Sequence, residues 1–473
     1  MLLSRLIIIA VVVLVPQHAL AAPALDGTAL RWPWAIPFIG ILLTIALGPL
    51  LLPRIWHQHY GKLVFVWGTF TIAPLAAIYG VPAAAAAFVH TMLAEFLSFI
   101  VLLFALYVIA GGILVTGNLR GTPVTNTIIL ALGTVIASVV GTTGAAMILI
   151  RPLIKANAAR LNNAHVLIFF IFLVGNIGGA LSPLGDPPLL IGFLHGVDFF
   201  WPTQQLWQQT ALVAGLVLAA FIVLDLWHYR ADRRITTVGE SPPPRDLAVR
   251  GAINFVLIAG ALAAILMSAL WKPGVRFEIY GTVRDLEDIL RDGALLSLAL
   301  LSLALTPDEH REANGFTWEP IREVAILFAG IFTCIIPVVA MLAAGRAGAF
   351  AWLIGAVTTQ DGAPHTVAYF WLTGILSAFL DNAPTYLVFF ELAGGNASEL
   401  MGPLKGTLAA ISLGAVLMGA LTYIGNAPNL MIYAIAVERG IKMPNFFGYM
   451  LWSAVVLLPI LALLTFLYVA PLW

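Results

Sequence analysis

Runs of about 20 apolar residues recur along most of the chain, and this feature limits the possible folds more than any other. A helix of that length spans the hydrocarbon core of a bilayer. Of the 473 residues, 61% are hydrophobic and only 10% are charged, whereas about 25% are charged in an average soluble domain. A water-soluble fold would expose too much apolar surface to water. The sequence therefore predicts an all-α polytopic membrane protein.

The apolar segments differ in how they cross the membrane. The segments predicted to span it are 34–52, 62–80, 84–116, 164–194, 208–226, 252–270, 292–306, 323–343, 404–436 and 446–470. Two others, 122–155 and 366–395, are interrupted midway by helix-breaking residues and are too short for two crossings, which predicts re-entrant hairpins. With 164–194 and 404–436 as broken helices, the expected fold has about 10–11 transmembrane helices and two hairpins.

Basic residues predict how these segments are oriented. With the N-terminus outside, the segments assigned to the cytoplasm carry about twice as many basic residues as the outside segments, following the positive-inside rule. Arg120 and Arg151 flank the first hairpin, so we expect it to enter and leave on the cytoplasmic side. The second hairpin has no basic residue near its ends and should enter from outside. Opposed hairpins are typical of two inverted-topology repeats.

The N-terminal residues 1–21 have the layout of a secretory signal. Arg5 is followed by the apolar stretch 6–15 and by the small-x-small site Ala19-Leu20-Ala21, where cleavage would leave the mature N-terminus outside. An uncleaved anchor is the alternative, and either one favours a bacterial inner membrane. We expect the first repeat at 30–228, a cytoplasmic linker at 229–250 and the second repeat at 251–473.

Four places combine helix breakers with polar groups inside apolar surroundings. They are Gly141-Thr142-Thr143-Gly144, Ser182-Pro183-Leu184-Gly185-Asp186-Pro187-Pro188, Asp381-Asn382-Ala383-Pro384-Thr385 and Gly425-Asn426-Ala427-Pro428-Asn429. Thr143 precedes Gly185 by 42 residues, and Asn382 precedes Gly425 by 43. Unwound backbone survives in hydrocarbon only where protein or a polar cavity surrounds it, and the freed carbonyls can bind a cation. The alternative is four packing kinks, which the pairing of the breaks disfavours.

Asp186 and Asp381 are the candidate residues for binding cations and protons. A carboxylate deep in a bilayer costs several kcal/mol unless it is paired, protonated or bound to a cation. Each of the two could therefore exchange a proton for a transiently bound sodium ion. Their alternative role is structural, with the carboxylate capping the N-terminus of a neighbouring half-helix.

Neutral oxygen donors stand beside these carboxylates, and hard cations such as sodium favour oxygen ligands. The candidates for completing an ion site are Asn382, Asn426, Asn429, Thr142, Thr143, Ser182 and Asn176. Each could instead cap a broken helix, and the glycines around Asn176 could instead allow close helix packing.

His90 and Glu95 lie in the apolar segment before the first hairpin. Five residues of helix place them on different faces, so they do not form an obvious pair. Either could relay protons or sense pH. A position at a helix boundary is the alternative.

At these motifs the chain resembles the ion transporter superfamily, which includes NhaD-type sodium/proton antiporters, arsenite permeases, citrate/metal carriers and dicarboxylate carriers. The similar segments are 175–188, 379–385 and 425–430. The resemblance implies inverted repeats, homodimers and a transport domain that moves against a scaffold. It also places the substrate at Thr142, Thr143, Asp186, Asp381, Asn382 and Asn426. Dicarboxylate carriers have Ser-Asn-Thr at both hairpin tips, whereas this chain has Gly-Thr-Thr and Asp-Asn-Ala.

The resulting hypothesis is sodium or lithium export in exchange for protons by alternating access, with Asp186 and Asp381 binding proton and cation competitively. A citrate, metal–citrate or arsenite-type anion carrier is the alternative. An enzyme is disfavoured because the sequence has neither an H-E-x-x-H metal motif nor a nucleophile motif. We expect no cofactor. The net charge of zero gives no electrostatic preference for nucleic acid.

Overall fold

The computed structural model describes residues 25–235, 245–359 and 361–470. The predicted signal at 1–21 lies outside these residues. Within the described ranges, nine helices are long and apolar enough to cross a membrane, and the strands form only two small two-stranded sheets. The predicted all-α polytopic fold is confirmed.

The first half of the chain contains three spanning segments, a helix hairpin, a broken helix and a last long helix. Its elements are η1 (Trp32–Ala35), α2 (Ile36–Leu51), α3 (Pro53–Tyr79), α4 (Val81–His90), the π-helix η2 (Thr91–Phe96), α5 (Leu97–Gly111), β1 (Leu114–Asn118), α6 (Pro123–Val140), α7 (Thr142–Ala156), α8 (Ala164–Leu173), η3 (Ile177–Leu181), α9 (Pro187–Leu194) and α10 (Trp201–Ile235).

The second half repeats this order with extra short elements. It contains β2 (Arg245–Arg250), α11 (Ile253–Leu270), β3 (Arg276–Ile279), β4 (Thr282–Asp285), α12 (Leu286–Leu305), α13 (Asp308–Ala313), α14 (Glu319–Ala343), η4 (Gly345–Ala347), α15 (Ala351–Val357), α16 (Thr366–Leu380), α17 (Asn382–Leu392), α18 (Ala397–Met401), α19 (Lys405–Met418), η5 (Gly419–Leu421), α20 (Ala427–Glu438), α21 (Phe446–Leu464) and the π-helix η6 (Thr465–Val469).

The segment expected as a linker, 229–250, has structure at both of its ends. Its first residues continue α10 to Ile235, and its last six form β2. This strand pairs antiparallel with β1, with Leu114 opposite Arg250. Residues 236–244, between the two ends, are not described.

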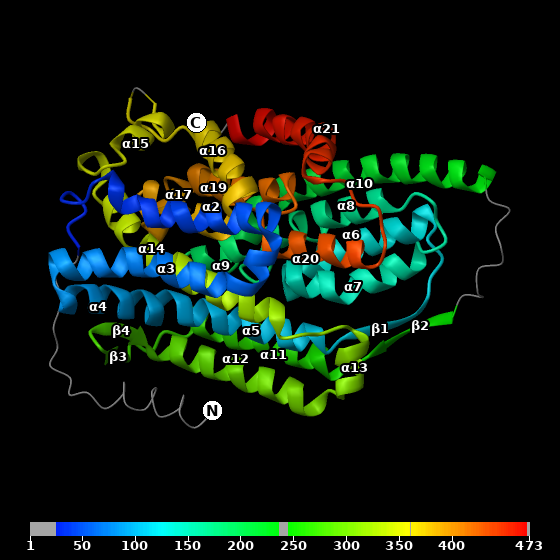
Figure 1. The fold of residues 1–473 in the computed structure, drawn as a ribbon, viewed down its shortest axis with the longest axis horizontal. Helices are drawn as coiled ribbons and strands as arrows, with labels where there is room; N and C mark the ends of the chain where they lie inside the picture. The colour runs from blue at the N-terminus through cyan, green and yellow to red at the C-terminus, as the bar shows by residue number, and fades with distance from the viewer. Residues whose placement is uncertain (1–24, 236–244, 360, 471–473) are drawn as a thin grey trace.

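Two pairs of short helices fold back as hairpins. In the first, the Thr122 side chain caps α6 by accepting a bond from the Thr125 amide at 3.2 Å. The turn between α6 and α7 is at Gly141, which has φ 82°, a value that glycine adopts freely. At the base, the Gly121 amide donates to the Ala156 carbonyl at 2.8 Å. Figure 1 shows this hairpin on the right, while the second one, α16–α17, lies on the left.

Each hairpin is followed by a helix that is broken at its centre. Between α8 and α9 the chain unwinds, and α9 restarts with proline in its first turn, where the missing amide costs no hydrogen bond. The break between α19 and α20 has the same form, with Asn426 capping α20 through the Asn429 amide at 2.9 Å. The two broken helices run in opposite directions, because α8 and α20 lie on the right and α9 and α19 further left (Figure 1).

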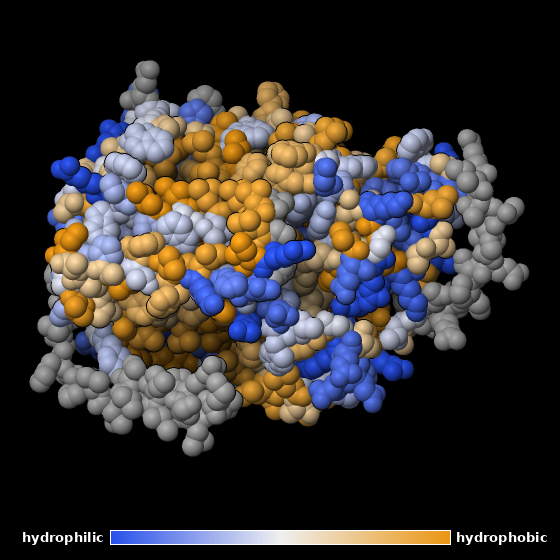
Figure 2. All heavy atoms as spheres, viewed as in Figure 1, coloured by the Kyte–Doolittle hydropathy of each residue, from blue (hydrophilic) through white to orange (hydrophobic). Residues whose placement is uncertain are grey.

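The broken helices form the centre of the molecule. Residues 166–173 of α8 are fully buried, whereas α3 exposes large apolar side chains such as Phe65 and Phe70. Figure 2 shows wide apolar areas on the flank of the molecule, with hydrophilic residues gathered mainly towards the right-hand end. An exposed apolar flank around a buried centre is what a bilayer-spanning bundle requires.

Candidate functional site

The two hairpin tips meet at the break of the first broken helix. The Thr142 amide, at the start of α7, donates to the Gly185 carbonyl at 2.9 Å. The Thr142 hydroxyl donates to Asp186 Oδ1 at 3.4 Å, and Asn382 Nδ2 donates to Asp186 Oδ2 at 2.6 Å. Asp186 is only 1% exposed. One buried carboxylate is therefore held between a side chain from each hairpin.

Asp381 supplies the second carboxylate from the tip of the other hairpin. It joins α16 to α17 with φ 77°, a backbone conformation that costs a non-glycine residue about 1–3 kcal/mol. The Thr385 hydroxyl donates to its carbonyl at 2.7 Å. Asp381 is half-buried, and it is close enough to interact electrostatically with Asp186. The structure thus brings together the two acids that the sequence singled out.

This acid pair has no cationic partner in the part of the chain that the structure describes, where the ion pairs involve other residues. Two neighbouring carboxylates away from bulk water repel each other unless a proton or a cation sits between them. Next to them, Asn382 Oδ1 is buried without a hydrogen-bond partner. A neutral oxygen left free beside two carboxylates suits a hard cation.

Three of the predicted oxygen donors form a separate asparagine cluster. Asn176 Nδ2 donates to Asn429 Oδ1 at 2.8 Å, and Asn426 Nδ2 donates to Asn176 Oδ1 at 2.9 Å. Asn429 Nδ2 also donates to the Gly419 and Thr422 carbonyls, at 3.0 and 3.2 Å. The side-chain oxygens already accept bonds within the protein, so the cluster joins the two broken helices and pairs their unwound backbone.

Ser182 has a precise counterpart in the second half of the chain. Its hydroxyl donates to the Ser138 carbonyl and accepts from the Leu184 and Gly185 amides, each at 3.2 Å. The Thr422 hydroxyl donates to the Ala378 carbonyl and accepts from the Ile424 amide at 3.3 Å. Both hydroxyls tie a helix break to its own hairpin.

Between the hairpin tip and the helix break, equivalent residues of the two halves are 240 positions apart. The turn residues Gly141 and Asp381 show this spacing, as do Ser182 and Thr422. It also matches Asp186 with Asn426. The first half therefore carries its acid at the helix break and the second half carries it at the hairpin tip. One acid from each half reaches the same site.

The remaining predicted residues lie apart from this pair or at its edge. Thr143 is half-buried, next to Thr142 on α7. His90 is exposed at the end of α4, and Glu95 is half-buried in the π-helix η2. Two backbone carbonyls of this π-turn, Leu93 and Ala94, accept bonds from Arg284 Nη1 at 2.7 and 3.1 Å. Glu95 interacts electrostatically with Glu391 near the end of α17, away from the hairpin tip.

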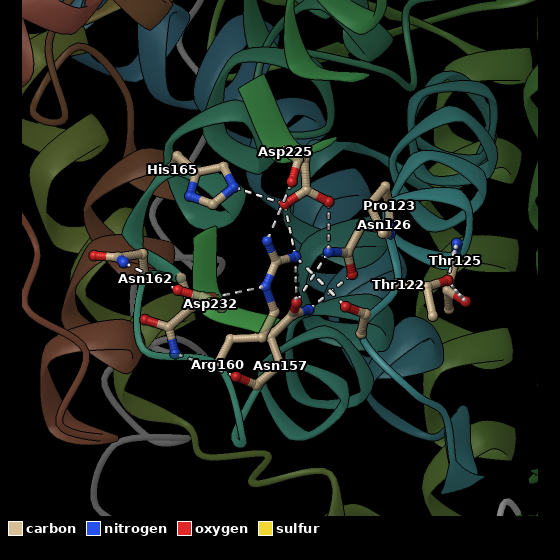
Figure 3. Close-up of polar contacts among 12 residues, drawn as sticks. Thr122, Pro123, Thr125, Asn126, Asn157, Arg160, Asn162, His165, Asp225 and Asp232 are labelled. Carbon is tan, nitrogen blue, oxygen red and sulfur yellow. Dashed lines mark hydrogen bonds and ion pairs between the residues drawn. The ribbon is translucent and has the colours of Figure 1, made fainter. Parts of the chain in front are cut away.

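A buried polar network at the base of the first hairpin is absent from the sequence predictions (Figure 3). Asp225 of α10 is fully buried and pairs with Arg160 Nη1 at 2.6 Å and His165 Nε2 at 2.7 Å. It also accepts from Asn126 Nδ2 at 3.1 Å, and Asn126 and Asn157 exchange bonds at 2.9 and 2.8 Å. The network fastens α6, the end of α7 and the start of α8 to α10.

One signal in the sequence could have revealed this network. Asp225 lies within the apolar segment 208–226 and His165 at the start of 164–194, and an ionisable residue inside a span calls for a partner. Neither residue lies beside a helix breaker, so the helix-break motifs do not point to either of them.

Comparisons with known proteins show what the chain is similar to. A family model described as "Putative citrate transport" matches residues 27–469. Two uncharacterized transporters, from Mycobacterium bovis and Mycobacterium tuberculosis, are each 25% identical over 341 residues, covering 68% of this chain and 71% of the relative. The chain is thus similar to membrane transporters over most of its length, and the names of these two relatives specify no substrate.

Proposed function

The chain belongs to the "Putative citrate transport" family, and from this premise we propose that it is a secondary active transporter in which Asp186 and Asp381 bind a cation and protons in alternation. The observation that supports the proposal is that Asp186 and Asp381, one from each half, are close enough to interact electrostatically, beside the free oxygen of Asn382. Sodium or lithium is the proposed cation, exchanged for protons.

The proposed chemistry is competition for one acidic site. When protonated, the two acids no longer repel each other, and the site can cross the low-dielectric interior without a net negative charge. When a monovalent cation binds, it replaces the protons and takes oxygen ligands from the carboxylates, Asn382 and Thr142. Cation and proton transport are coupled because the empty site, with two negative charges, is costly inside the membrane. Only the protein with bound protons or a bound cation therefore changes the side to which the site is exposed.

Citrate transport is the second candidate, and the family match favours it. Citrate is an anion, and two carboxylates repel it unless a cation binds between them. This version of the function therefore needs the same acid pair, now holding a cation that in turn binds citrate. It predicts citrate uptake that depends on a cation.

The wider architecture is also part of the proposal. We infer two inverted-topology repeats at 30–228 and 251–473, supported by the shared order of elements and the constant spacing of 240 residues. A bacterial inner-membrane location and a homodimer complete the proposal; the homodimer rests on the family resemblance.

Transport by purified protein in proteoliposomes tests the function, with sodium, lithium, potassium and labelled citrate compared side by side. Sodium or lithium should dissipate an imposed proton gradient, and Asp381→Asn and Asp186→Asn should abolish the exchange. Asp361→Asn is the matched control, because this acid is exposed on a loop, and it should behave as the unaltered protein. Exchange that survives both site variants would refute the site. Cation-dependent citrate uptake in place of exchange would establish the second candidate.

A further inference from the structure

A cavity of about 220 Å³ lies between the first hairpin and the elements beside it. Its wall is formed by α7 on one side and by β1 and the end of α13 on the other, with Thr116, Leu119, Arg151, Lys155 and Asn314 among its lining residues. The cavity is separate from the acid pair. Arg151 follows Thr142 by nine residues, which is about 13 Å along a helix.

Two cations line this cavity, and no acidic side chain does. Arg151 and Lys155 are four residues apart on α7, so they lie on one face of the helix, with Cβ atoms about 6 Å apart. Glu438 and Arg439, at the end of α20, interact electrostatically with Arg151. Their opposite charges largely cancel, which leaves the cavity with a positive potential.

Arg151 has hydrogen-bonding capacity that the protein does not use. Its Nη1 is buried without a partner, and its Nη2 makes one long bond of 3.4 Å to the Gly315 carbonyl. Lys155 is exposed and donates to the Gly117 carbonyl at 3.1 Å, which leaves further donors free. By contrast, Asn314 Nδ2 is already bonded to the Gly111 and Ile113 carbonyls, both at 3.1 Å. A buried guanidinium nitrogen without an acceptor is costly, and an anionic ligand would supply the acceptor.

We propose that this cavity is a binding site for a small polycarboxylate anion. The Arg151 guanidinium takes one carboxylate through its free nitrogen, in the planar geometry that arginine and carboxylate share. The Lys155 ammonium takes a second carboxylate one helical turn away. Two cations in one cavity thus favour a di- or tricarboxylate over an anion with a single charged group. Because the bound anion contacts α7 on one side and β1 and α13 on the other, it bridges the hairpin to its neighbours.

Direct binding to the purified, full-length protein tests this site, with citrate as the probe and isothermal titration calorimetry as the readout. Citrate should bind the unaltered protein, and Arg151→Gln and Lys155→Gln should each weaken binding by about tenfold to a hundredfold. Arg120→Gln is the matched control: it removes an exposed arginine from the neighbouring loop, and it should bind citrate normally. Lys155→Gln keeps the test decisive if Arg151→Gln fails to fold, because Lys155 is exposed.

Further titrations separate this site from others. Inorganic phosphate should bind more weakly than citrate, and vesicles of phosphatidylglycerol should not displace citrate. Asp381→Asn should bind citrate at this cavity as tightly as the unaltered protein, even though the proposed exchange is lost. The proposal is overturned if Arg151→Gln and Lys155→Gln bind citrate as tightly as the unaltered protein. It is also overturned if phosphatidylglycerol vesicles displace citrate, or if the protein binds phosphate as tightly as citrate. If Asp381→Asn abolishes citrate binding, citrate binds at the acid pair and not in this cavity.

Discussion

Replacing Asp381 with glycine is expected to abolish transport and yet give a more stable protein than replacing it with alanine. Asp381 turns the second hairpin at φ 77° and ψ 142°, and its equivalent in the first hairpin, Gly141, has φ 82° and ψ 154°. Apart from Tyr280, Asp381 is the one non-glycine residue with positive φ among the described residues. The conformation is thus one that glycine adopts freely and that an aspartate must be forced into.

The size of the effect follows from two opposing contributions. Holding a side chain at this φ costs about 1–3 kcal/mol, and both aspartate and alanine bear that cost. Glycine removes it but makes the unfolded chain more flexible, which destabilises the fold by about 0.4–1 kcal/mol relative to alanine. Asp381→Gly should therefore exceed Asp381→Ala in free energy of unfolding by up to about 2.6 kcal/mol. Both variants lose the carboxylate and its repulsion with Asp186, so the difference between their free energies of unfolding reflects only the backbone conformation at residue 381.

Reversible unfolding in mixed SDS micelles measures the free energies of unfolding, and cation/proton exchange in proteoliposomes measures the transport activity. Gly141→Ala is the reciprocal test, because it places a side chain in the same conformation, with a Cβ 3.2 Å from the Leu184 carbonyl oxygen. It should lose at least as much stability as Asp381→Gly gains over Asp381→Ala. If the glycine variant at 381 is less stable than the alanine variant by about 0.4–1 kcal/mol, the backbone there is not strained. If Asp381→Gly still exchanges cations, the carboxylate is not a ligand.

Three further variants test buried polar contacts at the base of the first hairpin and at the two helix breaks. Asp225→Ala should lower the free energy of unfolding by about 3–5 kcal/mol, because Arg160 and His165 would lose their buried partner. If the SDS concentration at the midpoint of unfolding is unchanged, the network does not stabilise the fold. Ser182→Ala should cost about 1–3 kcal/mol, because the Leu184 amide at the helix break loses its acceptor, whereas the Gly185 amide keeps the Ser182 carbonyl at 3.0 Å. Hydrogen exchange at the Leu184 amide should accelerate. Thr422→Val should lower the free energy of unfolding by a similar amount at the second break. If only one of the two variants is destabilised, the two hydroxyls are not equivalent.

The positions of the hairpins and breaks could be predicted from the sequence, because their causes are local. The hairpins predicted at 122–155 and 366–395 are helix pairs at 123–156 and 366–392, and the broken helix predicted at 164–194 has those bounds. Glycine and proline act on the backbone of their own residue or the next, and apolar runs of fixed length mark the membrane. Local chemistry was sufficient for these elements.

Which polar groups meet could not be predicted in the same way. Asn382 contacts Asp186 across 196 residues, whereas Asn176, an equally plausible ligand in the sequence, has its oxygen occupied by Asn426. The partners of Asp225, Arg160 and His165, lie about 60 residues away in the chain, so no local pattern joins them to it. The pairing of β1 with β2 across the central segment is also a long-range contact.

The sequence by itself determined that this chain is a membrane bundle with two hairpins, two broken helices and two acids at its breaks. Hydrophobic length and helix breaking are properties of short segments, so they can be read residue by residue. Only the tertiary structure decided that the two acids lie close enough to interact, that three asparagines join the breaks, and that Arg151 keeps a free nitrogen in a cavity. These outcomes depend on how distant helices pack, which no single segment encodes.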